Sequence, residues 1–229
     1  MPSIKDKKVP SKFSVEKAHT AQRLMSKRLI QRSPSTDLRY IAGADVAYTE
    51  WFSIGAVTVL DFKSLSIVES QTASVPTRFP YIPTLLAFRE IPPLVAALNT
   101  LRLQPDVFLV DGHGIMHPYR FGLACHFGLI AGKPTIGVAK KPMIGEIGRF
   151  DDRDWAPIVE ENEVVGVALA TAKEAKPIYV SVGHLVSLEK AIEIVKHCTP
   201  TERIPKPLRL AHNLAVETKR KTQNAWLTT

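Results

Sequence analysis

The chain has 229 residues, of which 45% are hydrophobic and 23% charged, and its formal net charge is +8. This composition is ordinary for a globular protein, and the length favours one domain covering residues 1–229. No apolar run approaches the roughly 18 residues of a membrane span, and the N-terminus lacks the apolar core of a signal peptide. We therefore expect a cytoplasmic protein with no membrane partner. Two cysteines, Cys125 and Cys198, are too few for a disulfide framework or a cysteine metal site.

The positive charge is concentrated at the two ends of the chain. Residues 1–32 hold nine Lys and Arg against Asp6 and Glu16, and residues 202–221 hold six Lys and Arg against two glutamates. The residues between these segments, 33–201, carry a net charge of −3. A slightly acidic centre between two basic segments, about 1–32 and 202–229, suits a polyanion that is gripped by the ends. A solvated basic tail is the alternative for the N-terminal segment.

The first third of the chain predicts one helix and an antiparallel meander. Apolar residues at helical spacing between Ser14 and Gln31 predict an amphipathic helix with a basic opposite face, and Ser33–Thr36 ends it. Strands joined by short polar turns are expected at Tyr40–Tyr48, Ile54–Phe62 and Ser66–Ala73. Their close spacing favours antiparallel pairing.

A proline-punctuated loop from Val75 to Pro83 leads to a predicted helix from about Thr84 to Leu101. Pro92 and Pro93 lie inside this helix and must kink it or divide it in two. The apolar run Val107–Val110 then has the length and composition of a buried strand.

A strand–helix–strand unit follows from this run. The strand ends on Asp111, a helix is expected from about Tyr119 to Ala131, and a second strand from Thr135 to Ala139. Such a unit predicts parallel strands with a right-handed crossover. Functional groups collect beyond the carboxyl ends of such strands, where Asp111, His117 and Lys140 fall. A tight loop with Asp111 as a turn residue is the alternative.

The last third of the chain begins with a polar loop near Asp151–Asp154. Strands are expected at Val164–Thr171 and Ile178–Val182, then a helix near Ser187–His197 and a proline-spaced basic C-terminus. Three antiparallel strands followed by alternating helices and parallel strands make an α/β mixed sheet flanked by helices. This order, βββαβαβ, resembles the ribonuclease H-like fold.

Three acidic residues are candidates for a reactive site. Asp45 lies in the middle of the apolar strand IAGADVAY, where an unpaired carboxylate is costly to bury, so a metal or another cation is expected beside it. In the mixed sheet this strand neighbours the one that ends on Asp111. Glu90 follows Arg89 in the long helix and alone would be an ordinary surface glutamate. Asp45 has a structural alternative too, as a hydrogen-bonded side chain.

Carboxylate oxygens of this kind suit Mg²⁺ or Mn²⁺, with further positions left to water and substrate phosphate. Such ions assist phosphodiester cleavage by activating water and stabilising the leaving oxygen. Zinc is disfavoured because no His/Cys spacing resembles a zinc site.

Several blocks of the sequence resemble the endonuclease V family, nucleases that recognise deaminated bases, chiefly inosine. The blocks are IAGADVAY (41–48), FPYIPTLLAFRE (79–90), DGHGIMHPYRFGLACHFGLIAGKPTIGVAKK (111–141) and, more weakly, RIPKPLRLAH (203–212). They lie in the family order, and the family has the ribonuclease H-like fold.

The resemblance implies roles for individual residues. Asp45, Glu90 and Asp111 would be the metal-binding catalytic carboxylates. His117 would help to position the water or the phosphate, and Lys140 would neutralise charge near the scissile phosphate. His212 matches a family position that carries His or Asp near the metal.

A second set of residues would bind the substrate. Tyr81, fixed between Pro80 and Pro83, matches a wedge that inserts into the nucleic acid at the lesion. The expected substrate-binding residues are Pro80, Tyr81, Ile82, Gly112, Gly114, Tyr119 and Arg120.

Two positions depart from the family pattern. Thr84 stands where family members usually have Gly, and Tyr119 stands where they usually have Arg directly after His-Pro. Arg120 is a candidate for the missing cation, and stacking by Tyr119 is the alternative. These departures bear on substrate preference and efficiency.

The function implied is a Mg²⁺-dependent endonuclease of DNA repair, with Mn²⁺ able to substitute and no organic cofactor. It would cut the second phosphodiester bond on the 3′ side of the deaminated base and leave a 3′-hydroxyl and a 5′-phosphate. Inosine-containing RNA is an open second substrate. The alternatives are another ribonuclease H-like nuclease, acting on RNA–DNA hybrids or branched DNA, and a nucleic-acid-binding protein with a silent site.

Overall fold

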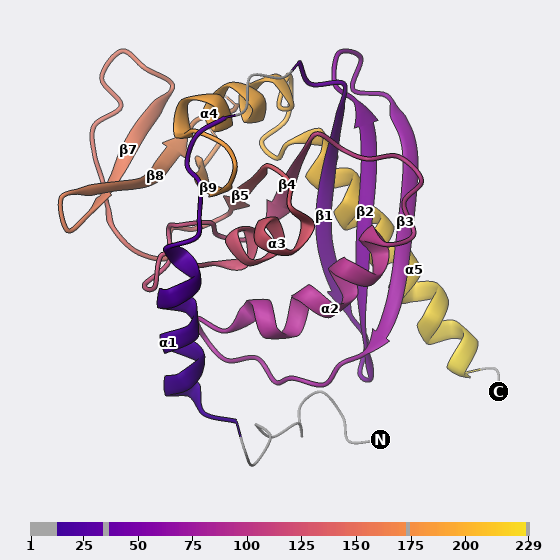
Figure 1. The fold of residues 1–229 in the computed structure, drawn as a ribbon. Helices are drawn as coiled ribbons and strands as arrows, with labels where there is room; N and C mark the ends of the chain where they lie inside the picture. The colour runs from indigo at the N-terminus through magenta and orange to yellow at the C-terminus, as the bar shows by residue number, and fades with distance from the viewer. Residues whose placement is uncertain (1–12, 34–36, 173–174, 228–229) are drawn as a thin grey trace.

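The computed structural model describes residues 13–33, 37–172 and 175–227 as one nine-stranded sheet with helices on both faces (Figure 1). The elements are α1 (Val15–Ser26), β1 (Tyr40–Tyr48), β2 (Phe52–Asp61), β3 (Ile67–Pro76), α2 (Leu86–Leu98), β4 (Val107–Asp111), α3 (Leu123–Ala131), β5 (Thr135–Ala139), β6 (Glu146–Ile147), β7 (Trp155–Glu160), β8 (Glu163–Leu169), β9 (Ile178–His184), α4 (Leu188–His197) and α5 (Lys206–Leu227). Residues 1–12, which belong to the predicted basic N-terminal segment, lie outside the described residues.

The strands follow the order β3-β2-β1-β4-β5-β9-β8-β7-β6 across the sheet. β1, β2 and β3 form the predicted antiparallel meander, and β1, β4 and β5 run parallel to one another. The mixed α/β, ribonuclease H-like architecture predicted from the sequence is confirmed, and it brings the carboxyl ends of three strands to one edge.

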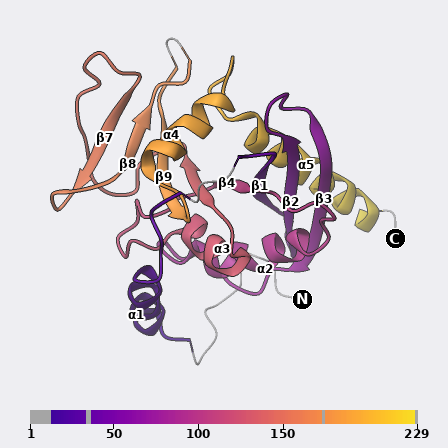
Figure 2. The ribbon, with the colours of Figure 1, turned by 45° about the horizontal axis from the view of Figure 1, so that its top comes forward.

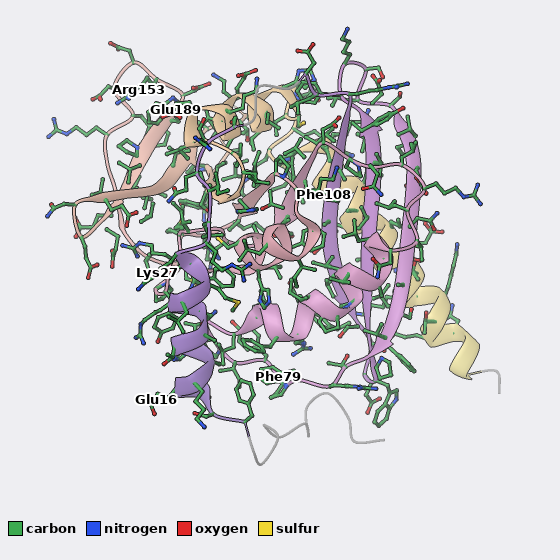
Figure 3. The ribbon with its side chains drawn as sticks, viewed as in Figure 1. Glu16, Lys27, Phe79, Phe108, Arg153 and Glu189 are labelled. Carbon is green, nitrogen blue, oxygen red and sulfur yellow. The ribbon has the colours of Figure 1, made fainter. Side chains whose placement is uncertain are left out.

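Strand alternation divides the core into two layers. On one face, α2 and α3 pack on Ala42, Ala44 and Phe108, the last of which is labelled in Figure 3. On the other face, α4 and the start of α5 pack on Ile41 and Leu109. Figure 2 shows α5 along β1, β2 and β3, on the side away from α2. The sheet is therefore covered on both faces where the parallel strands lie.

The helix α5 was missed by the sequence analysis, which predicted only a proline-spaced basic segment there. Pro205 and Pro207 suggested irregular structure, but they lie just before α5 and in its first turn, where a missing N–H removes no intrahelical bond. The buried residues Leu208, Ala211 and Ala215 have the spacing that would have revealed the helix.

Three further expectations are corrected. Beyond β5 the sheet is antiparallel, because β9 pairs antiparallel with β5 and β8 with β9. The short strands β6 and β7 were not predicted, although Ala156 and Ile158 alternate inward along β7. α3 begins at Leu123 rather than near Tyr119, since the segment before it is extended at Gly122.

The helix α2 is continuous despite its two prolines. The sequence left open whether Pro92 and Pro93 would kink the helix or divide it, and division is excluded. Ser14 caps α1 by accepting a hydrogen bond from the Lys17 amide.

Both cysteines are free and buried. Burial raises the pKa of the Cys198 thiol to about 12, so this sulfur stays protonated and behaves as a small hydrophobe. Among the described helices, none combines the length and the apolar character needed to cross a membrane.

The contact between α5 and β1 is direct, because a Cβ on Gly43 would lie 2.0 Å from the Pro207 carbonyl oxygen. Gly43→Ala is therefore expected to lower the free energy of unfolding by about 1–3 kcal/mol, as overpacked substitutions do. Gly132→Asn is the matched control, because Gly132 is exposed with a φ of 60° and Asn tolerates that conformation. Urea unfolding of the two variants measures the difference, and equal losses would contradict the close contact.

Candidate active site

The carboxyl ends of β1, β4 and β5 meet at one edge and bring three predicted site residues together. In the register of the parallel strands Ala44 lies opposite Val110, which places Asp45 beside Asp111. Lys140 directly follows β5, and its Nζ lies 3.3 Å from Asp111 Oδ2. The predicted adjacency of these two carboxylates and the lysine is thus present in the structure.

Glu90 reaches the same edge from α2 and is only 8% exposed. The Tyr48 hydroxyl, at the end of β1, donates a hydrogen bond of 2.5 Å to Glu90 Oε1. The Arg89 guanidinium lies over the Tyr48 ring, 3.9 Å from its centroid. Glu90 is therefore a buried residue of the site rather than an ordinary surface glutamate.

His212 comes from the helix that the sequence analysis missed. Its Nδ1 lies 2.8 Å from Asp45 Oδ2, and the Val46 amide donates to the other oxygen of this carboxylate at 2.7 Å. Asp45 thus has partners on both oxygens, and α5 contributes one of them.

Negative charge collects at this edge. The pKa of Glu90 is raised to about 8, first by burial and then by the charges of Asp45 and Asp111, although the hydrogen bond from Tyr48 opposes the shift. Burial and the charge of Asp111 also raise the pKa of Asp45, against the effect of His212. The three carboxylates therefore interact electrostatically, and a cation among them would relieve their repulsion.

In the described part of the chain, no three His, Cys, Asp or Glu side chains are gathered closely enough to enclose a metal ion as they stand. The donor chemistry nevertheless fits a hard divalent cation, since Asp45, Glu90 and Asp111 offer carboxylate oxygens at one edge. Each of these carboxylates is held instead by a side chain of the protein, Asp45 by His212, Asp111 by Lys140 and Glu90 by Tyr48.

A cavity of about 240 Å³ opens beside this edge, between the Pro80–Thr84 loop and the segment around His117. Tyr81 lines it and is 64% exposed, so this ring does not pack beneath α2. Ile82 packs inward instead, against a small cluster that includes Phe79 and Leu85. The loop thus presents an aromatic side chain at the mouth of a cavity.

His117 forms part of the cavity wall, and both of its ring nitrogens are engaged. Nε2 donates to the Thr84 carbonyl oxygen at 3.0 Å, and Nδ1 accepts from the Tyr119 amide at 3.2 Å. Burial lowers the pKa of His117 to about 4, so the ring is neutral at neutral pH. In this arrangement His117 holds the Pro80–Thr84 loop, and its predicted role toward water or phosphate stays a prediction.

Thr84 has a φ of 72°, which is strained for a β-branched residue. Three side chains hold it there. Gln22 Nε2 donates to the Thr84 carbonyl oxygen at 2.9 Å, His117 donates to the same oxygen, and His19 Nε2 is hydrogen-bonded to Thr84 Oγ1 at 2.9 Å. The helix α1 therefore clamps this loop.

The two glycines predicted to bind substrate are buried. A Cβ on Gly114 would lie 1.9 Å from the Val182 carbonyl oxygen, so packing against β9 requires a glycine there. The Gly112 amide donates to the Val138 carbonyl oxygen at 3.1 Å and extends the pairing of β4 with β5. Packing and strand pairing account for these two glycines, and a substrate contact stays a prediction.

Arg120 is not a free cation. Its Nε donates to Glu163 Oε2 at 2.8 Å, and a second glutamate, Glu161, lies 3.8 Å from Nη2. The Tyr119 ring lies 5.8 Å from that of His117, which lines the cavity. The structure thus disfavours the hypothesis that Arg120 replaces the family arginine.

The sequence analysis did not identify three residues of the site region: Tyr48, His19 and Gln22. Gln22 carried a signal, because it falls one helical turn after Ala18 on the apolar face of α1, and both are buried. Tyr48 and His19 carried none, since their partners lie 42 and 65 residues away along the chain.

Glu90→Gln is expected to stabilise the protein by about 1–3 kcal/mol in the presence of a chelator, because an amide carries no buried charge. A carboxyl group with a raised pKa destabilises the fold as the pH rises, so the gain should grow between about pH 4.5 and 8. Unfolding measured across this range tests it, with Tyr48→Phe as a control expected to lower stability. Equal pH dependence in wild type and Glu90→Gln would contradict the burial of this charge.

Comparison with known proteins identifies the family. The endonuclease V family model matches residues 22–213. Endonuclease V of Thermofilum pendens is 43% identical over 207 residues, covering 90% of this chain and 89% of that protein. The crystal structure of endonuclease V from Streptomyces avermitilis matches with a TM-score of 0.86 and 37% identity, covering 94% of this chain and 98% of that chain.

A third match is to a complex. Endonuclease V from Ciona intestinalis, bound to a 24mer DNA containing an inosine followed by a ribo-adenosine, has a TM-score of 0.83 and 30% identity, over 91% of this chain and 98% of that chain. These similarities extend over the sheet, the three carboxylates and the cavity, and they show that the chain belongs to the endonuclease V family of nucleases.

Proposed function

We propose that this protein is a Mg²⁺-dependent endonuclease of DNA repair that recognises a deaminated base, chiefly inosine, in the cytoplasm. The cut falls at the second phosphodiester bond on the 3′ side of the base and leaves a 3′-hydroxyl and a 5′-phosphate. The observation that carries the proposal is a cavity with an exposed aromatic ring at its mouth, next to a strand edge with three carboxylates. The Ciona intestinalis relative, whose DNA contains inosine, supports the choice of base.

The cavity suits recognition of a base outside the helical stack. A base within a duplex hides its Watson–Crick edge, so an enzyme that reads this edge must extrude the base into a pocket. An aromatic ring can then fill the gap in the stack. The exposure of the Tyr81 ring supports this role, and its neighbour Ile82 anchors the loop.

Asp45, Glu90 and Asp111 would hold the Mg²⁺, which activates water and stabilises the leaving oxygen when bound. The other side chains of the site orient these ligands. Tyr48 fixes Glu90 and His212 fixes Asp45 by hydrogen bonds. Lys140, beside Asp111, supplies positive charge where the scissile phosphate would approach.

The alternatives are weighed by the same geometry. A silent nucleic-acid-binding protein has no need to place three carboxylates together, so the raised pKa of Glu90 and its position beside Asp45 and Asp111 argue for catalysis. A ribonuclease H-like nuclease that does not read an extruded base would not need a cavity beside an exposed tyrosine.

Cleavage of matched strands tests the proposed function. Labelled DNA and RNA strands carry one inosine or the corresponding adenosine, and each is incubated with Mg²⁺, with Mn²⁺ or with a chelator. Metal-dependent cutting of only the inosine strands, one nucleotide beyond the lesion, is expected. Metal-independent cutting, or equal cutting of the adenosine strands, would refute the proposal.

Asp45→Ala, Glu90→Ala and Asp111→Ala are each expected to abolish cleavage. The loss should exceed the roughly 10–100-fold that changes around a metal site cause, because a ligand itself is removed. Asp152→Ala is the control, since Asp152 is an exposed turn residue away from this edge. Cleavage by Asp111→Ala close to the wild-type rate would mean that the site is misplaced.

Tyr81→Ala is expected to slow cleavage of duplex inosine strongly and of single-stranded inosine less. Stacking of an aromatic ring on a base contributes about 1–3 kcal/mol, and only the duplex has a gap to fill. Tyr81→Phe retains the ring and should be mild. Single-turnover rates on both substrates measure this, and an equal loss on duplex and single strand would refute the wedge.

A further inference from the structure

The basic side chains near the cavity differ in whether a carboxylate of the described residues pairs with them. Lys140 is paired with Asp111 and Arg120 with Glu163. Arg23 of α1 is exposed, and no carboxylate of the described residues pairs with it. Its charge is therefore available to a ligand.

Arg23 is nevertheless held in place. Its guanidinium carbon lies 4.7 Å from the centroid of the Tyr119 ring. The Tyr119 hydroxyl is hydrogen-bonded to His19 Nδ1 at 3.0 Å, and the two rings lie 4.2 Å apart. The Tyr119 ring also lies 5.8 Å from that of His117, which lines the cavity. Tyr119 thus contacts Arg23 and lies close to a residue of the cavity wall.

We propose that Arg23 binds a backbone phosphate of the substrate strand, next to the nucleotide whose base enters the cavity, and that Tyr119 and His19 are positioning residues for it. The inference rests on the proposed function, since it assumes that a base occupies the cavity. It assigns part of the substrate-binding surface to α1.

The chemistry of the pair supports a phosphate ligand. A guanidinium that stacks on an aromatic face keeps its N–H groups free at its edge, and its planar fork matches two phosphate oxygens. Stacking at an exposed site contributes about 0.5–1 kcal/mol, enough to favour one orientation. Holding the side chain in advance also reduces the ordering entropy lost on binding.

This arrangement suggests a role for Tyr119, the residue that stands where family members usually have Arg. Tyr119 places no charge of its own after His117-Pro118, but it provides the surface on which Arg23 rests. His19 connects this surface to the Pro80–Thr84 loop, because its other nitrogen bonds Thr84. Cation, platform and loop therefore form one connected unit.

Lys27 offers a matched control on the same helix. It is the C-cap residue of α1, four residues after Arg23 and therefore on the same side of the helix, and Figure 3 labels it. Lys27 is exposed like Arg23, and no aromatic ring supports it among the described contacts. If general positive charge on α1 were sufficient, the two residues would contribute equally.

The test measures binding of a labelled single strand with one deoxyinosine, in the presence of a chelator so that the strand is not cut. Fluorescence anisotropy over a series of salt concentrations gives the dissociation constant and its salt slope. Arg23→Ala is expected to weaken binding by about tenfold, as loss of a hydrogen bond to a charged group does. It should also reduce the slope of log K against log salt by roughly 0.7, the value for one phosphate contact on a single strand. Lys27→Ala should change affinity less than about twofold.

Variants of the platform test the positioning role. Tyr119→Leu removes the ring and should weaken binding a few-fold, whereas Tyr119→Phe retains it and should lie between Tyr119→Leu and wild type. Adding Arg23→Ala to Tyr119→Leu should cause less than the sum of the two losses, since the residues act together. Full additivity would overturn the positioning role. Tyr119→Leu is unsuitable if its melting temperature is lowered. The same additivity test is then made with Tyr119→Phe and with His19→Ala, each with and without Arg23→Ala.

The outcomes separate this inference from the proposed function. Because a phosphate contact is independent of the base, Arg23→Ala should weaken binding of the matched adenosine strand by the same factor. Equal effects of Arg23→Ala and Lys27→Ala, or a loss confined to the inosine strand, would overturn the phosphate assignment. Failure of the wild-type protein to cut or prefer inosine would instead refute the proposed function, while the Arg23 comparison on either strand would keep its meaning.

Discussion

The structure depends on the burial of like charges at the end of a parallel sheet. Asp45, Glu90 and Asp111 lie close enough that each raises the energy of another in its ionised form. Such a cluster opposes folding unless compensating groups are placed around it. Each element that reaches this edge supplies either a carboxylate or a side chain that compensates the negative charge. The need for this compensation explains why elements from most of the chain converge there.

The C-terminal helix α5 takes part in the site because it packs on the strand that carries Asp45. α5 lies directly on β1 at Gly43, where no side chain would fit, and this contact brings His212 to Asp45. The same helix carries Lys219, Arg220 and Lys221 along its exposed end, although the last of these pairs with Glu217. Its first turns therefore complete the site, and its later turns retain part of the basic charge that the composition located at this end of the chain.

The sequence predicted the strands β1 to β5, β8 and β9, because strand periodicity is a local signal, and it predicted the edge on which the carboxylates lie. The pairing was predicted correctly only as far as β5. Asp45 was recognisable as a charge inside an apolar strand. The contacts that hold the site have no local signal, since Tyr48 meets Glu90 and His212 meets Asp45 across 42 and 167 residues of chain. Only the family resemblance placed His212 near the carboxylates. Such pairs depend on how the helices pack on the sheet, and no spacing in the sequence encodes them. The missed helix α5 shows the same limit. Its prolines indicated irregular structure, and the helical spacing of its buried residues became meaningful only once they packed on the sheet.

The Pro80–Thr84 loop shows how far packing overrides local preference. A β-branched residue with a φ of 72° opposes the observed conformation, and strain of this kind costs about 1–3 kcal/mol. Hydrogen bonds of Gln22, His19 and His117 with Thr84 offset it, and two of these three side chains come from α1. The loop therefore keeps its shape because α1 and the cavity wall hold it, while the two prolines only limit the alternatives. A rigid mouth of this kind can present Tyr81 to a nucleic acid with little ordering entropy left to lose, and it makes α1 a structural determinant of how that ring is presented.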